Sequence, residues 1–199
     1  APAEAPWRPH TPGDGNTPQG SIPSHSHWRG DFNPWRGYTW WVLREAVARN
    51  PQITLDATGW SAPAWVENIW SQDMADYYVM WLQALRHVHG MELDALGCHN
   101  EKGYSYDFAK ALRRTMDENG FEAVRLHAFD NWGRQKLDFL GEMIRDSSLA
   151  AAIDIVSAHT FSEIPVTAEQ HAQIQKLGKT LWNSEEHIYR PGFDCLITI

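Results

Sequence analysis

Apolar and polar positions alternate along this chain in two different periods, and the change between them marks its elements. From about residue 51 onward, short apolar runs of strand length are separated by segments in which apolar residues recur every three to four positions. The runs predict five β-strands, at Ile53–Ala57, Leu93–Cys98, Ala123–Ala128, Ala152–Ala158 and Lys179–Trp182. Strands joined through helices run parallel, so the pattern predicts an α/β fold.

Periodicity predicts a helix before the first strand and another after it. The first covers about Arg36–Arg49 and should end at Asn50-Pro51, because the residue before a proline disfavours helical geometry. The second covers Met74–Val88, whose large apolar side chains fall on one face.

Capping residues predict two further helices. Ser105 can cap a helix that runs to residue 119, where Gly120 is suited to stop it. Thr167 and Gln170 have the spacing of a capping box, and the helix that they begin should end near Gly178.

Two folds combine parallel strands with intervening helices, the open doubly wound sheet and the (β/α)₈ barrel. None of the predicted strands is followed by the glycine-rich turn of a nucleotide-binding sheet. Polar and aromatic residues instead gather where the strands end, at Thr58–Trp60, His99–Glu101, Asp130–Trp132, His159-Thr160 and Ser184–Glu186. Barrels build their active sites at this end of their strands, so the sequence favours a TIM barrel.

The barrel should be incomplete, because a full one needs about 250 residues and eight strands and this chain has 199 residues. We expect residues 1–35, which are rich in Pro and Gly, to form an N-terminal loop region and residues 36–199 to form a partial catalytic barrel. Missing strands would expose barrel edges and apolar helix faces. The 199-residue chain alone should therefore aggregate or be inactive.

The composition of the chain disfavours some classes of partner and favours a sugar ligand. A net charge of -8 disfavours nucleic acid and anionic membrane surfaces as partners, and no apolar run is long enough to insert into a membrane. The eleven tryptophans are an unusually large share. An indole offers a flat apolar surface with one N–H donor, which suits stacking on a sugar ring. We expect about half of the tryptophans to fill the core instead.

Two predicted strands end in carboxylates. Glu101 follows Gly97-Cys98-His99-Asn100, and a partly shielded carboxyl there would have a raised pKa and could protonate a leaving oxygen. The last strand ends in Glu185-Glu186, and strand alternation leaves open which of the two faces the site, since a bulge can change the register. A separation of about 5 Å across the barrel mouth would be the geometry of a retaining glycosidase.

Other strand ends offer sugar-binding or metal-binding groups. Two indoles in Gly59-Trp60-Ser61-Ala62-Pro63-Ala64-Trp65 could wall a sugar pocket. His25 and His27 are spaced as metal ligands are on an extended segment, and His159 follows a strand. No complete ligand set is visible, so we expect neither a metal nor another cofactor, and a metal-dependent hydrolase is only an alternative.

Seven segments, in order, resemble glycoside hydrolase family 59, the galactocerebrosidases, within a clan of retaining barrel glycosidases. They are Gly13-Asp14-Gly15 with Pro23–His27, Arg36–Trp41, Arg49–Leu55, Trp60–Trp65, Asn100-Glu101, Ser157–His159 and Leu181–Glu185. Trp60–Trp65 also looks like family 30 of the same clan, which suggests a glucosidase or glucanase as an alternative.

The resemblance implies a role for individual residues. Glu101 would be the proton donor and Glu185, not Glu186, the nucleophile, with Asn100 and Trp60 as sugar contacts. His159 would line the same pocket. The resemblance further implies that the first strand, most of the second and the eighth lie outside the chain, with a β-sandwich domain downstream, and a secreted or lysosome-like location.

This chain departs from the family pattern around the pocket. The family has a Thr-Thr pair, whose second member contacts the sugar, where Thr17-Pro18 stands here. By the resemblance, Thr17 would make this contact instead, or the contact would be absent. His99 replaces a Trp-like residue, and Thr160 stands where the family has Tyr. We therefore expect a β-galactoside substrate that could resemble galactosylceramide, hydrolysed with two glutamates. A non-catalytic carbohydrate-binding barrel is the rival from another class.

Overall fold

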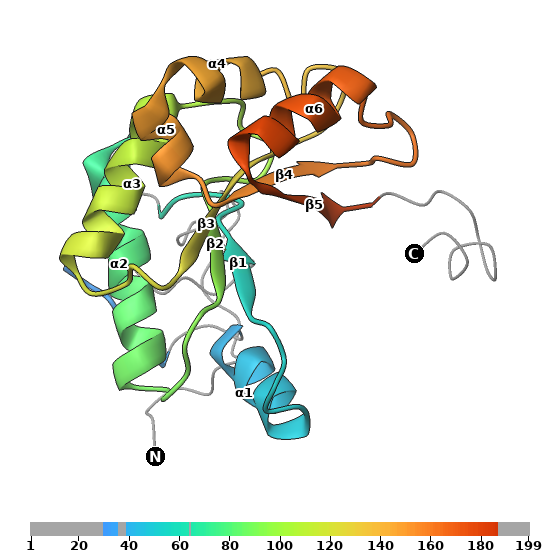
Figure 1. The fold of residues 1–199 in the computed structure, drawn as a ribbon. Helices are drawn as coiled ribbons and strands as arrows, with labels where there is room; N and C mark the ends of the chain where they lie inside the picture. The colour runs from blue at the N-terminus through green and yellow to red at the C-terminus, as the bar shows by residue number, and fades with distance from the viewer. Residues whose placement is uncertain (1–29, 36–38, 64, 187–199) are drawn as a thin grey trace.

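The computed structural model describes residues 30–35, 39–63 and 65–186. Five strands form one sheet in which they lie in sequence order and run parallel: β1 (Asp56–Thr58), β2 (Ala95–Gly97), β3 (Arg125–Asn131), β4 (Ile155–His159) and β5 (Thr180–Glu185). The sheet curls into part of a barrel (Figure 1). All five predicted strands are confirmed, and the fold is α/β as expected.

Helices fill the connections between the strands. They are α1 (Thr39–Arg49) before β1, α2 (Gln72–His87) after β1, α3 (Tyr106–Glu118) after β2, α4 (Leu140–Arg145) and α5 (Ser147–Ala152) after β3, and α6 (Ala168–Leu177) after β4. Figure 1 shows α2 to α6 on one side of the curled sheet. Within the described ranges, none of these helices has the length and apolar character to cross a membrane.

The predicted caps form as expected. The Ser105 hydroxyl accepts a hydrogen bond from the Phe108 N–H at 3.3 Å, and Thr167 and Gln170 complete a capping box. Gly178 ends α6 with a φ of 65°, which glycine adopts without strain. These local signals therefore fix the ends of α3 and α6.

The short helices α4 and α5 had no sequence prediction. Asp146 separates them and caps α5, because its carboxylate accepts the N–H groups of Ser148 and Leu149. Each helix has only six residues, which is too few to show a helical period.

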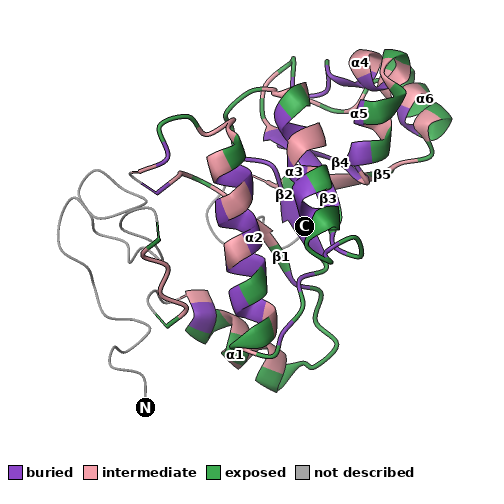
Figure 2. Ribbon diagram, turned by 90° about the vertical axis from the view of Figure 1, so that its left-hand side faces the viewer, coloured by how far each residue is buried: buried purple, intermediate pink, exposed green. Residues whose placement is uncertain are grey.

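The hydrophobic core lies between the helices and the sheet. All five residues of β4 are buried, and α2 and α3, which both carry many buried residues, lie in front of the strands in Figure 2. Trp40 is completely buried and stacks on Trp81 with ring centroids 4.9 Å apart. Trp60 and Trp132 are instead 65% and 62% exposed. The tryptophans thus divide between the core and the surface.

Gly97 in β2 has no room for a side chain, so Gly97→Ala should destabilise the fold. A Cβ atom there would lie 2.5 Å from His127 Cε1 and 2.5 Å from Thr58 Oγ1. Overpacking of this kind costs about 1–3 kcal/mol of unfolding free energy. Denaturant titration measures this loss.

Gly141→Ala in α4 is the matched control, since its Cβ would make ordinary contacts at 3.6 Å or more. It should be neutral or stabilising by up to about 1 kcal/mol because Ala favours helices. Equal unfolding free energies for the two variants would contradict the packing seen around Gly97.

Candidate active site

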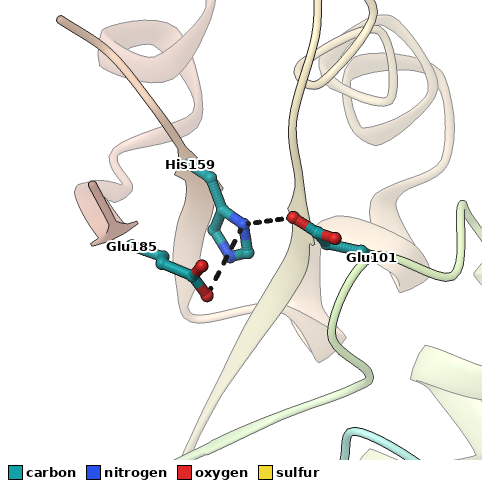
Figure 3. A group of neighbouring side chains, drawn as sticks. All are labelled: Glu101, His159 and Glu185. Carbon is teal, nitrogen blue, oxygen red and sulfur yellow. Dashed lines mark hydrogen bonds and ion pairs between the residues drawn. The ribbon is translucent and has the colours of Figure 1, made fainter. Parts of the chain in front are cut away.

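Three strand ends bring Glu101, His159 and Glu185 together (Figure 3). Nδ1 of His159 lies 3.1 Å from an oxygen of Glu101 and 4.0 Å from an oxygen of Glu185. One oxygen of each glutamate and one ring nitrogen of His159 all lie within 4.8 Å of one another. His159 is buried, whereas the two carboxylate side chains are 31% and 29% exposed. The carboxylates therefore face each other at a solvent-accessible edge of the sheet.

A bulge in β5 determines which glutamate faces Glu101. Ala158 pairs with Asn183 and His159 pairs with Glu185, so the register skips Ser184. The adjacent Glu186 points elsewhere, because its carboxylate accepts hydrogen bonds from the Ser162 hydroxyl and, at 2.6 Å, from the Asn183 amide. In the structure, therefore, Glu185 rather than Glu186 lies beside Glu101.

The end of β3 holds the Glu101 loop. The Glu101 N–H donates to the Asp130 carbonyl at 3.1 Å, and the Asn131 side chain makes two hydrogen bonds of 3.0 Å with the backbone of Gly103. Glu101 has a φ of 54°, a left-handed conformation that costs a non-glycine residue about 1–3 kcal/mol. These three hydrogen bonds offset that cost.

A buried charge network lies beneath the strand ends. Nε2 of His127 is 3.0 Å from an Asp56 oxygen, and its Nδ1 is 3.0 Å from both an Asp130 oxygen and the Ser157 hydroxyl. Burial lowers the pKa of His127, but the hydrogen bonds and charges of Asp130 and Asp56 outweigh it and raise that pKa to about 9. The pKa of Asp130 is lowered, because the contacts with His127 and Ser184 outweigh its desolvation.

Lys136 supports the strand end that carries His159. It is buried, and its ammonium donates to the carbonyls of His159 at 2.6 Å and Thr160 at 3.1 Å. Desolvation lowers the pKa of Lys136 to about 8. Thr160 has a φ of 55°, and its N–H donates to the Glu185 carbonyl at 2.8 Å. Lys136 therefore holds the end of β4, and the Thr160 N–H links that end to β5.

The remaining predicted sugar contacts lie in different surroundings. Asn100 is buried, and its N–H donates to the carbonyl of Gly59, the residue before Trp60, at 2.9 Å. The loops that carry Asn100 and the exposed Trp60 are therefore adjacent. Thr17 lies outside the described residues.

The histidines divide between the core and the site. The ring nitrogens of His99 lie 3.2 Å from the Gly59 carbonyl and 3.0 Å from the Ile69 carbonyl, so His99 ties two loops together. His25 and His27 lie outside the described residues. Glu101, His159 and Glu185 are spaced closely enough to hold a metal ion, but the same spacing also suits one carboxylate that acts as a nucleophile beside another that transfers a proton.

Four residues of the site have no individual prediction from the sequence: Asp130, Asn131, Lys136 and Ser184. Three of them fall in the strand-end clusters Asp130–Trp132 and Ser184–Glu186. Membership of these clusters was the only sign in the sequence that they could belong to the site. Nothing in the sequence marks Lys136.

Much of the sequence is similar to one protein family and to curated members of it. The model of "Glycosyl hydrolase family 59" matches residues 10–198. The chain is 37% identical over 182 residues to the galactocerebrosidase of Salmo salar, covering 88% of this chain and 26% of that protein. It is 35% identical over 181 residues to the human galactocerebrosidase, covering 87% and 25%. The chain thus spans about a quarter of the length of these curated relatives.

Solved structures share the fold at lower identity. SrfJ from Salmonella typhimurium superimposes with a TM-score of 0.61 at 20% identity, over 79% of this chain and 41% of that one. A glycoside hydrolase family 30 subfamily 8 xylanase from Clostridium acetobutylicum gives 0.57 at 18% identity, over 82% and 46%. The resemblance to the family 59 pattern is therefore confirmed, and so is the likeness to family 30 at the level of the fold.

His127 should remain protonated at pH 8, where an ordinary histidine with a pKa near 6.5 is neutral. Its folded-state pKa of about 9 lies above the unfolded value. The stability it contributes is therefore fully present below about pH 6.5 and is lost as the pH rises through 9. An NMR titration of the ring protons measures the midpoint, which Asp130→Asn should lower. A wild-type midpoint at or below pH 7 would contradict the ion pair.

Proposed function

Because this chain belongs to glycosyl hydrolase family 59, we propose that the protein is a retaining β-glycosidase that hydrolyses β-galactosides with Glu101 and Glu185. One observation carries the proposal: an oxygen of each carboxylate lies within 4.8 Å of the other at the end of the parallel sheet. Retaining enzymes keep their two carboxyl groups about 5–5.5 Å apart, whereas inverting enzymes leave about 6.5–9.5 Å for a water molecule.

The two glutamates act in a double displacement. Glu185 attacks the anomeric carbon and forms a glycosyl ester, while Glu101 protonates the departing oxygen. Glu101, now a carboxylate, then takes a proton from a water molecule that attacks the ester and releases Glu185. Both carboxylates are partly exposed, so substrate and water can reach them.

His159 favours Glu101 as the proton donor. Its Nδ1 is 3.1 Å from Glu101 and 4.0 Å from Glu185. A neutral imidazole protonated on Nε2 can accept a hydrogen bond from the protonated Glu101 carboxyl, which holds the proton in place before transfer. The resemblance places His159 in the sugar pocket, but its ring is buried, so its proposed role there is to hold Glu101.

The remaining sugar contacts follow the family resemblance. Asn100 and Trp60 lie on adjacent loops beside Glu101, and an exposed indole offers a stacking surface for a sugar ring. Thr17 is proposed as a further contact on the resemblance alone.

β-Galactosides are the favoured substrates because the similar curated proteins are galactocerebrosidases, and a galactosylceramide-like glycolipid would fit the same mechanism. A family-30-like glucosidase or glucanase is the second candidate, supported by the fold shared with a family 30 xylanase. The close carboxylates argue against a non-catalytic carbohydrate-binding protein, which needs no such pair. A metal-dependent hydrolase would bind its ion through Glu101, His159 and Glu185, the number of protein ligands that catalytic zinc sites use, but the family resemblance favours the two-glutamate mechanism.

The parallel sheet is proposed to be part of a (β/α)₈ barrel. The family resemblance assigns the first strand, most of the second and the eighth, as well as a β-sandwich domain, to sequence outside this chain. Activity should therefore be measured on the protein with all of the sequence that its gene encodes.

Glu185→Gln should abolish hydrolysis of aryl β-galactosides, because an amide cannot form the glycosyl ester. Glu101→Gln should lower the rate about 10²–10⁴-fold on poor leaving groups and far less on dinitrophenyl substrates, which need no protonation to leave. Steady-state kinetics on a series of leaving groups measure both effects.

Glu186→Gln is the matched control, since Glu186 is bound by Ser162 and Asn183 and faces away from Glu101. It should keep most of the wild-type activity. Normal turnover by Glu185→Gln, or loss of activity only in Glu186→Gln, would show that the assignment is wrong.

A further inference from the structure

Two strands flanking β4 each contain a bulge, and the two bulged residues contact each other. In the β3–β4 pair, Phe129 is opposite Ser157 and Asn131 is opposite Ala158, which leaves Asp130 unpaired. In the β4–β5 pair, Ser184 is unpaired in the same way. The Ser184 hydroxyl donates a hydrogen bond of 2.6 Å to the Asp130 carboxylate. A bulged residue has no partner in the hydrogen-bonded strand pair that would fix its position. The hydrogen bond between Ser184 and Asp130 holds both bulged residues instead.

Each bulge sets the direction of one glutamate. The extra residue at Ser184 places Glu185, instead of Ser184, opposite His159, and a shift of one residue would turn Glu185 to the other face. Asp130 has a φ of 46°, and its carbonyl accepts the N–H of Glu101. Asp130 therefore contacts the loop of one glutamate through its backbone and the strand of the other through its side chain.

We propose that the hydrogen bond between Ser184 and Asp130 is a positioning contact for both glutamates, because it locks together the two bulges that direct them. This inference rests on the proposed function. Asp130 is completely buried whereas Ser184 is exposed, so the hydroxyl reaches inward from the surface to a carboxylate that has itself no access to water. His127 pairs with the carboxylate at 3.0 Å and keeps it ionised, which makes it a strong acceptor for the Ser184 proton.

The Ser184 hydroxyl has one proton and two oxygens within reach. The Ala158 carbonyl is 3.4 Å away, much farther than the Asp130 oxygen at 2.6 Å. Removing the hydroxyl therefore breaks the contact between the bulges without breaking the pair between His127 and Asp130. Ser184→Ala tests the contact separately from the buried ion pair.

Ser184→Ala should lower kcat about tenfold on an aryl β-galactoside, the change expected when one hydrogen bond that orients a reacting group is lost. KM should change little, because the substrate is still bound. The number of competent sites is counted by titration with a fluoro-galactosyl inactivator, so that kcat refers only to folded enzyme. Ser184→Thr keeps a hydroxyl and should restore most of the rate.

Two further variants separate positioning from stability. Thr115 on α3 has a hydrogen-bonded hydroxyl as Ser184 does, but it is buried and donates to the Ala111 carbonyl at 2.8 Å, away from the strand ends. Thr115→Val should lower the melting temperature but leave kcat unchanged. Asp130→Asn keeps the shape and tolerates the left-handed backbone, but it removes the charge and should lower kcat more than Ser184→Ala does.

The inference is overturned if Ser184→Ala has wild-type kcat for each titrated site, or if Thr115→Val lowers kcat equally. A crystal structure of Ser184→Ala tests the contact independently of activity. If the contact positions Glu185, this residue should move from its place opposite His159. If the wild-type protein hydrolyses no glycoside but Glu185 moves, the proposed function fails and the positioning contact stands. An unmoved Glu185 in an enzyme with normal kcat refutes the contact alone.

Discussion

The buried carboxylate of Asp130 connects the fold of this protein to its candidate site. Burying an unpaired charge would cost several kcal/mol, and here His127 and Ser184 provide the partners. Asp56 and Ser157 bind the same imidazole from β1 and β4, so the network ties four strands together. The helices cover the sheet with an ordinary apolar core, but this polar cluster determines how the strands end.

The backbone is strained at the strand ends where the two carboxylates meet. Glu101, Asp130 and Thr160 are the described non-glycine residues with positive φ, and each costs about 1–3 kcal/mol. Each is held by a hydrogen bond from its backbone to a neighbouring strand end or loop. Rigid placement of this kind is useful to an enzyme that must hold two carboxylates on opposite sides of one bond. Strain alone does not identify a function, but its position agrees with the proposed one.

Much of the fold could be predicted because its signals are local. Apolar runs located all five strands, and Ser105 and the Thr167–Gln170 pair located two helix starts, since a cap depends on residues three positions apart. The bulges at Asp130 and Ser184 could not be predicted, because register depends on contacts between distant segments. Lys136 reaches His159 across 23 positions of sequence and carries no pattern of its own. The strand ends pointed to Glu101 and to Glu185-Glu186, the family resemblance selected Glu185, and the closeness of Glu101 and Glu185 required the structure.

In the proposed mechanism, Glu185 becomes covalently bound to the sugar while Glu101 transfers the proton. A 2-deoxy-2-fluoro galactosyl fluoride slows release of the glycosyl ester, so the labelled peptide can be isolated and sequenced by mass spectrometry. The measurement belongs on the protein with all of its encoded sequence. The account predicts a single label on Glu185. A label on Glu186 or Glu101, or turnover of natural substrate with no covalent intermediate, would contradict it.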